Sequence, residues 1–137
     1  MQIAAQADQP REEWCAGVET RMHVSARNGS AQLCMFEQWI APAISARAHS
    51  HPVEEVLTVV AGKAEMWMDD NQIILTGGQS YIVPAHQTHG FRNVGSDTLH
   101  IYAVLASPVF EATFDGETQP VRLWDDPPPT NKEYRDD

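Results

Sequence analysis

Residues 43–62 read AISARAHSHPVEEVLTVVAG and contain the pattern that decides the fold. Two runs of strand-forming residues flank Pro52, and His49 and His51 stand one residue apart in the first run. In a β-strand, residues i and i+2 point to the same face about 6.5–7 Å apart, so both imidazoles can reach one metal ion. Glu55 opens the next run and can add a carboxylate there. The pair also fits two half-buried strand histidines with ordinary hydrogen bonds.

Similar short apolar or alternating runs fill the chain from residue 18 onward, and Gly-, Asn- and Asp-containing turns separate them. Their close spacing favours an antiparallel barrel or sandwich, because a parallel sheet would need helical crossovers. We therefore predict an all-β domain with strands at Glu19–Ser25, Ala31–Ile40, Ala46–His51, Glu55–Ala61, Lys63–Met68, Gln72–Leu75, Ser80–Val83, His89–Asn93, Leu99–Leu105, Val109–Phe114 and Val121–Trp124.

The 137 residues correspond to one domain. The only helix that we predict covers Pro10–Ala16, where a proline and three charged residues resemble a first helical turn. We expect an N-terminal arm over 1–17, the β-barrel over 18–114, and an acidic, proline-rich C-terminal arm or tail over 115–137.

Charge and composition exclude several classes of protein. Nineteen acidic residues oppose nine basic ones, giving a net charge of −10, which disfavours nucleic acid and anionic lipid as partners. No apolar run approaches the ~20 residues of a membrane-spanning helix. The N-terminus lacks a secretory signal pattern, so we expect a cytoplasmic protein. Cys15 and Cys34 do not have the spacing of a thiolate zinc site.

A further histidine, His89, opens a predicted strand after Pro84. Imidazole and carboxylate ligands together suit Mn, Fe, Co, Ni, Cu or Zn rather than calcium. In order and spacing, these residues resemble the two motifs of the cupin superfamily. The first motif, G-x5-H-x-H-x(3,4)-E-x6-G, is matched by Ala43 in place of the leading glycine, His49, His51, Glu55 and Gly62. The second, G-x5-P-x-G-x2-H-x3-N, is matched by Gly78, Pro84, His86 in place of a glycine, His89 and Asn93.

The resemblance implies a small single-domain cupin of type 2, with a double-stranded β-helix or jelly-roll barrel. It also implies that one divalent transition-metal ion, Fe, Mn, Ni or Zn, is held by His49, His51, Glu55 and His89. For Asn93 it implies a loop-bracing role. Gly62 and Gly78 fall at hairpin turns, where a positive φ is often needed.

Strand alternation extends the list of candidate site residues. If His49 faces inward, Arg47 does so as well, and its guanidinium could hold a substrate carboxylate; an outward Arg47 that offsets nearby acidic groups is the alternative. Leu57 shares the face of Glu55, and Phe91 shares the face of His89, so both are substrate-binding candidates.

Two further residues are candidates for catalysis. His86 could act at the cavity rim as a proton shuttle or extra ligand, because histidine titrates near neutrality, or it could point to solvent. Tyr102 is a possible cavity residue, although aromatic side chains in small barrels more often belong to the core.

The resemblance implies a metal-dependent protein that acts on a small molecule, and we expect a non-haem metal oxygenase of the dioxygenase type. An isomerase or lyase that uses the metal as a Lewis acid, or a non-catalytic binding or sensing module, remains an alternative. We also expect a homodimer, because Phe36, Trp39 and Ile40 make both faces of one strand apolar.

Overall fold

The computed structural model describes residues 2–125, so the Pro127–Pro129 run of the expected tail lies outside the described residues. Within that range, the chain forms strands and two single turns of 3₁₀ helix, η1 (Gln6–Asp8) and η2 (Ala26–Asn28). No helix of the described range has the length and hydrophobicity that a membrane crossing requires. The strands are β1 (Arg11–Cys15), β2 (Val18–Val24), β3 (Cys34–Ile40), β4 (Ser45–Ser50), β5 (Glu55–Ala61), β6 (Lys63–Met68), β7 (Asn71–Thr76), β8 (Ser80–Val83), β9 (His89–Asn93), β10 (Leu99–Leu105), β11 (Phe110–Phe114) and β12 (Val121–Leu123).

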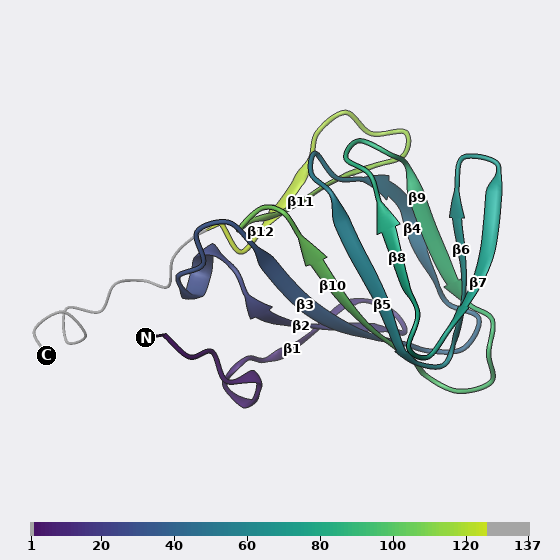
Figure 1. Cartoon of the computed structure of the whole chain (residues 1–137), viewed down its shortest axis with the longest axis horizontal. Coiled ribbons are helices and arrows are strands. Elements are labelled where there is room, and N and C mark those ends of the chain that lie inside the picture. Colours follow the sequence, from purple (N-terminus) through teal and green to yellow (C-terminus); the bar gives the residue numbers. More distant parts are fainter. Residues whose placement is uncertain (1, 126–137) are drawn as a thin grey trace, which may run out of the picture.

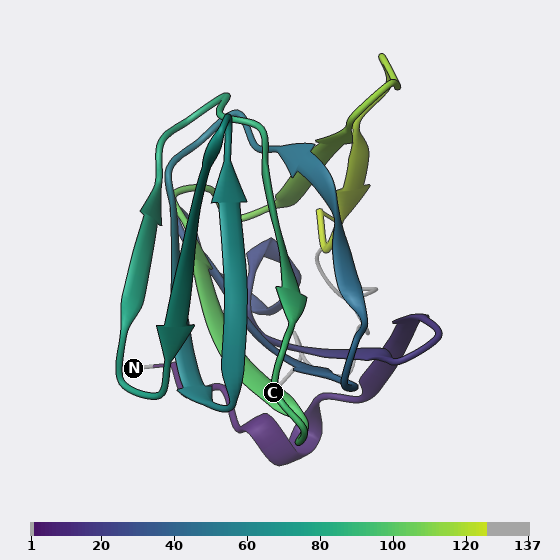
Figure 2. The same ribbon diagram turned by 90° about the vertical axis from the view of Figure 1, so that its right-hand side faces the viewer.

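The strands form two antiparallel sheets, which pack against each other as a jelly-roll (Figure 1). One sheet has the order β1-β2-β3-β10-β5-β8 and the other β12-β11-β4-β9-β6-β7. Strands far apart in the sequence are therefore neighbours, as β10 is between β3 and β5. The 90° view shows the β1 edge and the β11–β12 hairpin on the same side of the molecule (Figure 2). The predicted all-β cupin barrel is confirmed.

Alternating side chains of both sheets fill the interior. On β10, Leu99, Ile101, Ala103 and Leu105 are all buried, whereas the residues between them are half-buried. An aromatic cluster around Trp14 joins the two sheets, with ring centroids 5.1–6.0 Å from those of Phe36, Phe110 and Trp124. The barrel therefore has one continuous apolar core.

The helix predicted over Pro10–Ala16 is wrong. Residues 11–15 form β1, which pairs antiparallel with β2. Exposure alternates along β1, because Glu12 and Trp14 are half-buried and the residues around them are exposed. Pairing with the edge of β2 satisfies the backbone and outweighs the local helix signal. The expected N-terminal arm thus contributes a strand to one sheet, and β12 in the expected C-terminal segment pairs with β11 of the other.

Both departures from the cupin motifs adopt the left-handed backbone conformation. Ala43 and His86 each have a φ of 67°, where the motif has glycine. The turn glycines Gly62 and Gly78 have φ values of 100° and 88°, as expected. The chain therefore keeps the backbone geometry of the motifs without the glycines that adopt it most easily.

Candidate metal centre

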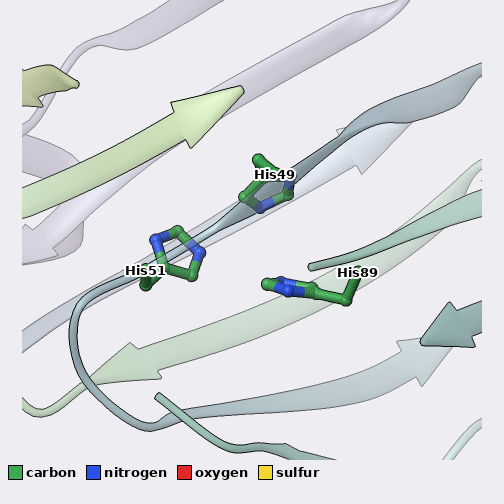
Figure 3. Close-up of side chains that lie close together, drawn as sticks. All are labelled: His49, His51 and His89. Carbon is green, nitrogen blue, oxygen red and sulfur yellow. The ribbon is translucent and has the colours of Figure 1, made fainter. Parts of the chain in front are cut away.

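Three histidines converge between the sheets. His49 lies on β4 opposite His89 on β9, and His51 follows the end of β4. Their nearest ring nitrogens all lie within 4.8 Å of one another, and the three rings surround a common space (Figure 3). His51 and His89 are buried and His49 is half-buried. The structure thus brings together the histidines that the sequence singles out.

A backbone carbonyl fixes the tautomer of each imidazole. Since a carbonyl oxygen only accepts hydrogen bonds, the Nδ1 atom facing it must carry the proton. In a neutral ring, Nε2 then offers a lone pair to the shared space, which is the form that binds metals. The Nδ1 atoms of His49, His51 and His89 donate to the carbonyls of Arg47 (2.6 Å), Glu111 (2.8 Å) and Gln87 (2.9 Å) respectively.

Glu55, on β5 of the opposite sheet, completes the cluster. Its Oε1 lies 3.1 Å from Nε2 of His89 and 3.5 Å from Nε2 of His51, and the residue is only 2% exposed. Nε2 of His51 is buried and has no hydrogen-bond partner among the described residues. Lone pairs on neutral imidazoles that face a carboxylate repel it unless a cation lies between them. The four side chains therefore fit a divalent transition-metal ion.

The charges of the cluster suit metal binding near neutral pH. Burial, followed by the charges of His89 and His51, lowers the pKa of His49 to about 4. Burial alone would raise the pKa of Glu55, but the imidazoles of His51 and His89 beside it lower it to about 2. For His51, burial lowers the pKa, but the nearby carboxylate of Glu55 and the carbonyl of Glu111 raise it overall, a shift that opposes metal binding. His49 is thus neutral and Glu55 ionised, as ligands must be.

Cys34 lies in the same sheet as Glu55, two strands away, and does not resemble a thiolate ligand. Burial, followed by the charge of Glu55, raises the pKa of its thiol to about 12. The side chain stays protonated and packs as a small apolar group.

A cavity of about 640 Å³ between the sheets reaches the cluster. Exposed lining residues on β1, β4 and β12, among them Glu13, Arg47 and Val121, place its mouth at the edge shared by these strands. Leu57 and Phe91 line its wall, as alternation predicts. The full lining consists of Glu12, Glu13, Trp14, Cys15, Val18, Phe36, Gln38, Ile40, Ser45, Ala46, Arg47, His49, His51, Glu55, Leu57, Phe91, Ile101, Ala103, Phe110, Phe114, Val121 and Leu123.

Arg47 lies at the rim of this cavity with its side chain 58% exposed. Its guanidinium is 2.9 Å from Oε2 of Glu117 and 4.9 Å from the ring centroid of Phe114. The register between β4 and β9 shifts between Ala46 and His49, so a bulge interrupts the alternation on which the inward placement rested. Arg47 is therefore an ion-paired rim residue.

The two candidates for catalysis lie elsewhere. The side chain of His86 is exposed and does not line the cavity, whereas its backbone N–H donates to the carbonyl of His51 at 2.7 Å. Tyr102 lies on the other face of β10 from the cavity-lining Ile101 and Ala103. The candidate placement of Tyr102 in the cavity is thus corrected, because β10 turns its apolar row Leu99, Ile101, Ala103 and Leu105 inward.

Gln38 is a polar cavity residue that we did not single out from the sequence. It is 7% exposed, and its Nε2 donates to Oγ1 of Thr20 at 3.0 Å. The available signal was its alternation with Phe36 and Ile40, which places an amide in an otherwise apolar inward row.

A second ionisable cluster lies on the outer face of the β1-containing sheet. Glu37, only 3% exposed, has one carboxylate oxygen 2.9 Å from Nε2 of His23 and the other 2.6 Å from Nε2 of His100. Burial would raise the pKa of Glu37, but these hydrogen bonds lower it. The ring of Trp39 stacks on that of His100 at 5.2 Å.

Comparison of the sequence with models of known protein families identifies a cupin domain in this chain. The model of the cupin domain family matches residues 36–105, about half of the chain, and this range includes the four clustered side chains. The chain therefore belongs to the cupin family. No curated protein is significantly similar to it in sequence.

Solved structures share the fold. The polyketide cyclase RemF from Streptomyces resistomycificus has a TM-score of 0.71 at 17% identity, over 87% of this chain and 88% of that one. KdgF from Halomonas sp. has a TM-score of 0.67 at 16% identity, over 77% and 94%. Oxalate decarboxylase from Lactobacillus farciminis has a TM-score of 0.72 at 17% identity, over 80% of this chain but only 34% of that one. At these identities, the similarity shows the fold alone.

Proposed function

We propose that this cupin is a metal-dependent enzyme of the dioxygenase type that acts on a small molecule. The observation that supports it most is the convergence of three imidazoles, each with its Nδ1 proton held by a backbone carbonyl, two of which also have Nε2 beside the Glu55 carboxylate. His49, His51, His89 and Glu55 would hold the ion. Bound there, a transition metal would supply coordination positions open to substrate and a redox-active or Lewis-acidic centre.

The chain's own residues prepare this site in three ways. Carbonyls of Arg47, Glu111 and Gln87 orient the imidazoles, so little reorganisation is needed on binding. Apolar side chains such as Leu57 and Phe91 limit the water around the cluster. The dry surroundings strengthen each electrostatic interaction with a substrate.

Oxygen uptake by iron-reconstituted protein tests the reaction class. The substrate panel comprises catechols, flavonols, β-diketones and thiols. We expect oxygen consumption with at least one compound, and none from the His49→Ala/His51→Ala variant. Turnover without oxygen consumption would instead support the isomerase or lyase alternative, and metal uptake without any turnover would support the binding module.

We also propose that the protein assembles as a homodimer. Phe36 and Ile40 are buried inside the barrel, so they offer no surface to a partner. Exposed apolar side chains on other strands, Val60, Ile73, Ile74 and Ile82, now motivate it. Light scattering at micromolar concentration should return twice the chain mass, and a monomer mass would contradict the dimer.

A further inference from the structure

The cavity is larger than the metal cluster requires. Its volume of about 640 Å³ lies in the range of sites that hold drug-sized ligands. Aromatic side chains from several strands, including Phe36, Phe91, Phe110 and Phe114, line it. Flat ring faces pack well against rings of a ligand. A two-carbon acid would leave most of this surface unfilled.

The charges at the mouth of the cavity disfavour a substrate carboxylate there. Glu12 and Glu13 line the β1 side, and the whole chain carries a net charge of −10. Arg47, the cation at the rim, is paired with Glu117 at 2.9 Å. A substrate carboxylate would have to displace Glu117, which revises the expectation that Arg47 anchors an anionic substrate.

Gln38 gives the cavity a second hydrogen-bonding site, apart from the histidine cluster. Thr20 occupies one heteroatom of its amide, and whichever way the amide is turned, the other heteroatom remains for a ligand. The side chain of Gln38 is nearly buried among apolar neighbours and is fixed by Thr20. A ligand with no polar group at this place would therefore leave the second heteroatom of the amide without a hydrogen bond.

Strand register gives the offset between Gln38 and the cluster along the strand direction, to which the two-strand distance between β3 and β5 adds. Glu55 pairs with Leu105, and Leu105 pairs with Cys34, so these three residues form one row across the sheet. Gln38 lies four residues further along β3, or about 13 Å at strand spacing. A ligand that reaches both points must be elongated.

We propose that the cavity binds an elongated, ring-containing substrate without a carboxylate group, which places oxygen atoms at the histidine cluster and a hydroxyl or carbonyl group at Gln38. This inference rests on the proposed metal-dependent function. It assigns Gln38 as the residue that selects substrates by their far end, and Thr20 as the residue that positions it.

The test uses the zinc-loaded full chain and two rigid probes. 3-Hydroxyflavone and 3,4′-dihydroxyflavone share a chelating hydroxy-ketone and differ by one distal hydroxyl. Fluorescence titration should show that wild type binds the dihydroxy compound about three- to tenfold more tightly, as one neutral hydrogen bond allows. Oxalate, a small dianionic chelator, should compete poorly with either probe.

Gln38→Leu should bring the dissociation constants of the two probes to within about twofold of each other without changing the zinc content. The control Gln72→Leu, at an exposed residue of β7, should still bind the dihydroxy probe more tightly. If Gln38→Leu unfolds because Thr20 loses its partner, the Thr20→Val/Gln38→Leu variant removes both polar groups and should give the same result. Equal binding of the probes by wild type, or a preference that survives Gln38→Leu, would overturn the inference alone. Failure to take up zinc would overturn the proposed metal site and this inference with it.

Discussion

Nε2 of His89 lies 3.1 Å from Oε1 of Glu55, while Nδ1 of the same ring donates its proton to the carbonyl of Gln87. A neutral imidazole has only one N–H, so a lone pair and a carboxylate oxygen face each other inside the barrel. Either a proton on Nε2 or a cation between the two atoms makes this approach favourable. Because the imidazoles of His49 and His51 lie beside the same pair, the geometry fits a metal ion.

Replacing both histidines of the first motif should remove the metal. The His49→Ala/His51→Ala variant leaves one imidazole and one carboxylate, too few ligands to hold a transition-metal ion firmly. Metal analysis after gel filtration should give near-zero content. His86→Ala is the matched control, because the imidazole of His86 is exposed and outside the cluster. Full metal retention by the double variant would show that the ion binds elsewhere.

Glycine at position 86 should stabilise the protein. His86 has a φ of 67°, a conformation that costs an L-residue about 1–2 kcal/mol, part of which the greater unfolded-state freedom of glycine offsets. His86→Gly should therefore raise the free energy of unfolding by up to about 1 kcal/mol, measured in urea.

Replacing a glycine at another position with positive φ provides the control. A Cβ at Gly78 would meet no atom within 4 Å, so Gly78→Ala reports the backbone cost without a clash and should be destabilising. A marked loss of stability in His86→Gly would mean that the imidazole makes a contribution beyond its backbone conformation.

The stability of the fold should depend on the ionisation of Glu37. Its pKa is lowered in the folded state from the ordinary value of 4.5, because the hydrogen bonds from His100 and His23 outweigh burial. A lowered folded pKa gives stability that is present above about 4.5 and is lost as the pH falls through the folded value.

Urea unfolding as a function of pH tests this dependence. Glu37→Gln should lose the part of the acid response that wild type shows below about pH 4.5, whereas Glu54→Gln, at an exposed residue, should keep it. Identical pH profiles for wild type and Glu37→Gln would contradict the assignment.

Replacing Arg47 should have only a small effect on the stability of the fold. Arg47 and Glu117 are both more than half exposed, and such ion pairs contribute about 0–1 kcal/mol. Arg47→Ala should keep the metal and lower the free energy of unfolding by no more than about 1 kcal/mol. Loss of metal from Arg47→Ala would show instead that its side chain supports the cluster.

Alternation along the sequence predicted most strands, because the period of two is a local property of each run. It also placed Leu57 and Phe91 on the cavity wall. The histidine cluster followed from the motif spacing, since His49 and His51 share a strand face and the fold pairs His49 with His89.

The errors concern how strands pair and which face of a strand turns inward. β1 is a strand because the edge of β2 pairs with it, which its own residues do not indicate. The position of Arg47 depends on a bulge between β4 and β9. On β10 the alternation of Leu99, Ile101, Ala103 and Leu105 with His100 and Tyr102 already indicates that Tyr102 faces outward.

Metal analysis of freshly purified wild-type protein, prepared without chelator and then offered Mn, Fe, Ni or Zn, tests the central claim most directly. The account predicts one transition-metal ion per chain, either as purified or after addition, and its loss in the His49→Ala/His51→Ala variant. Near-zero metal content in the purified protein, with no uptake of any of the four metals, would contradict the account.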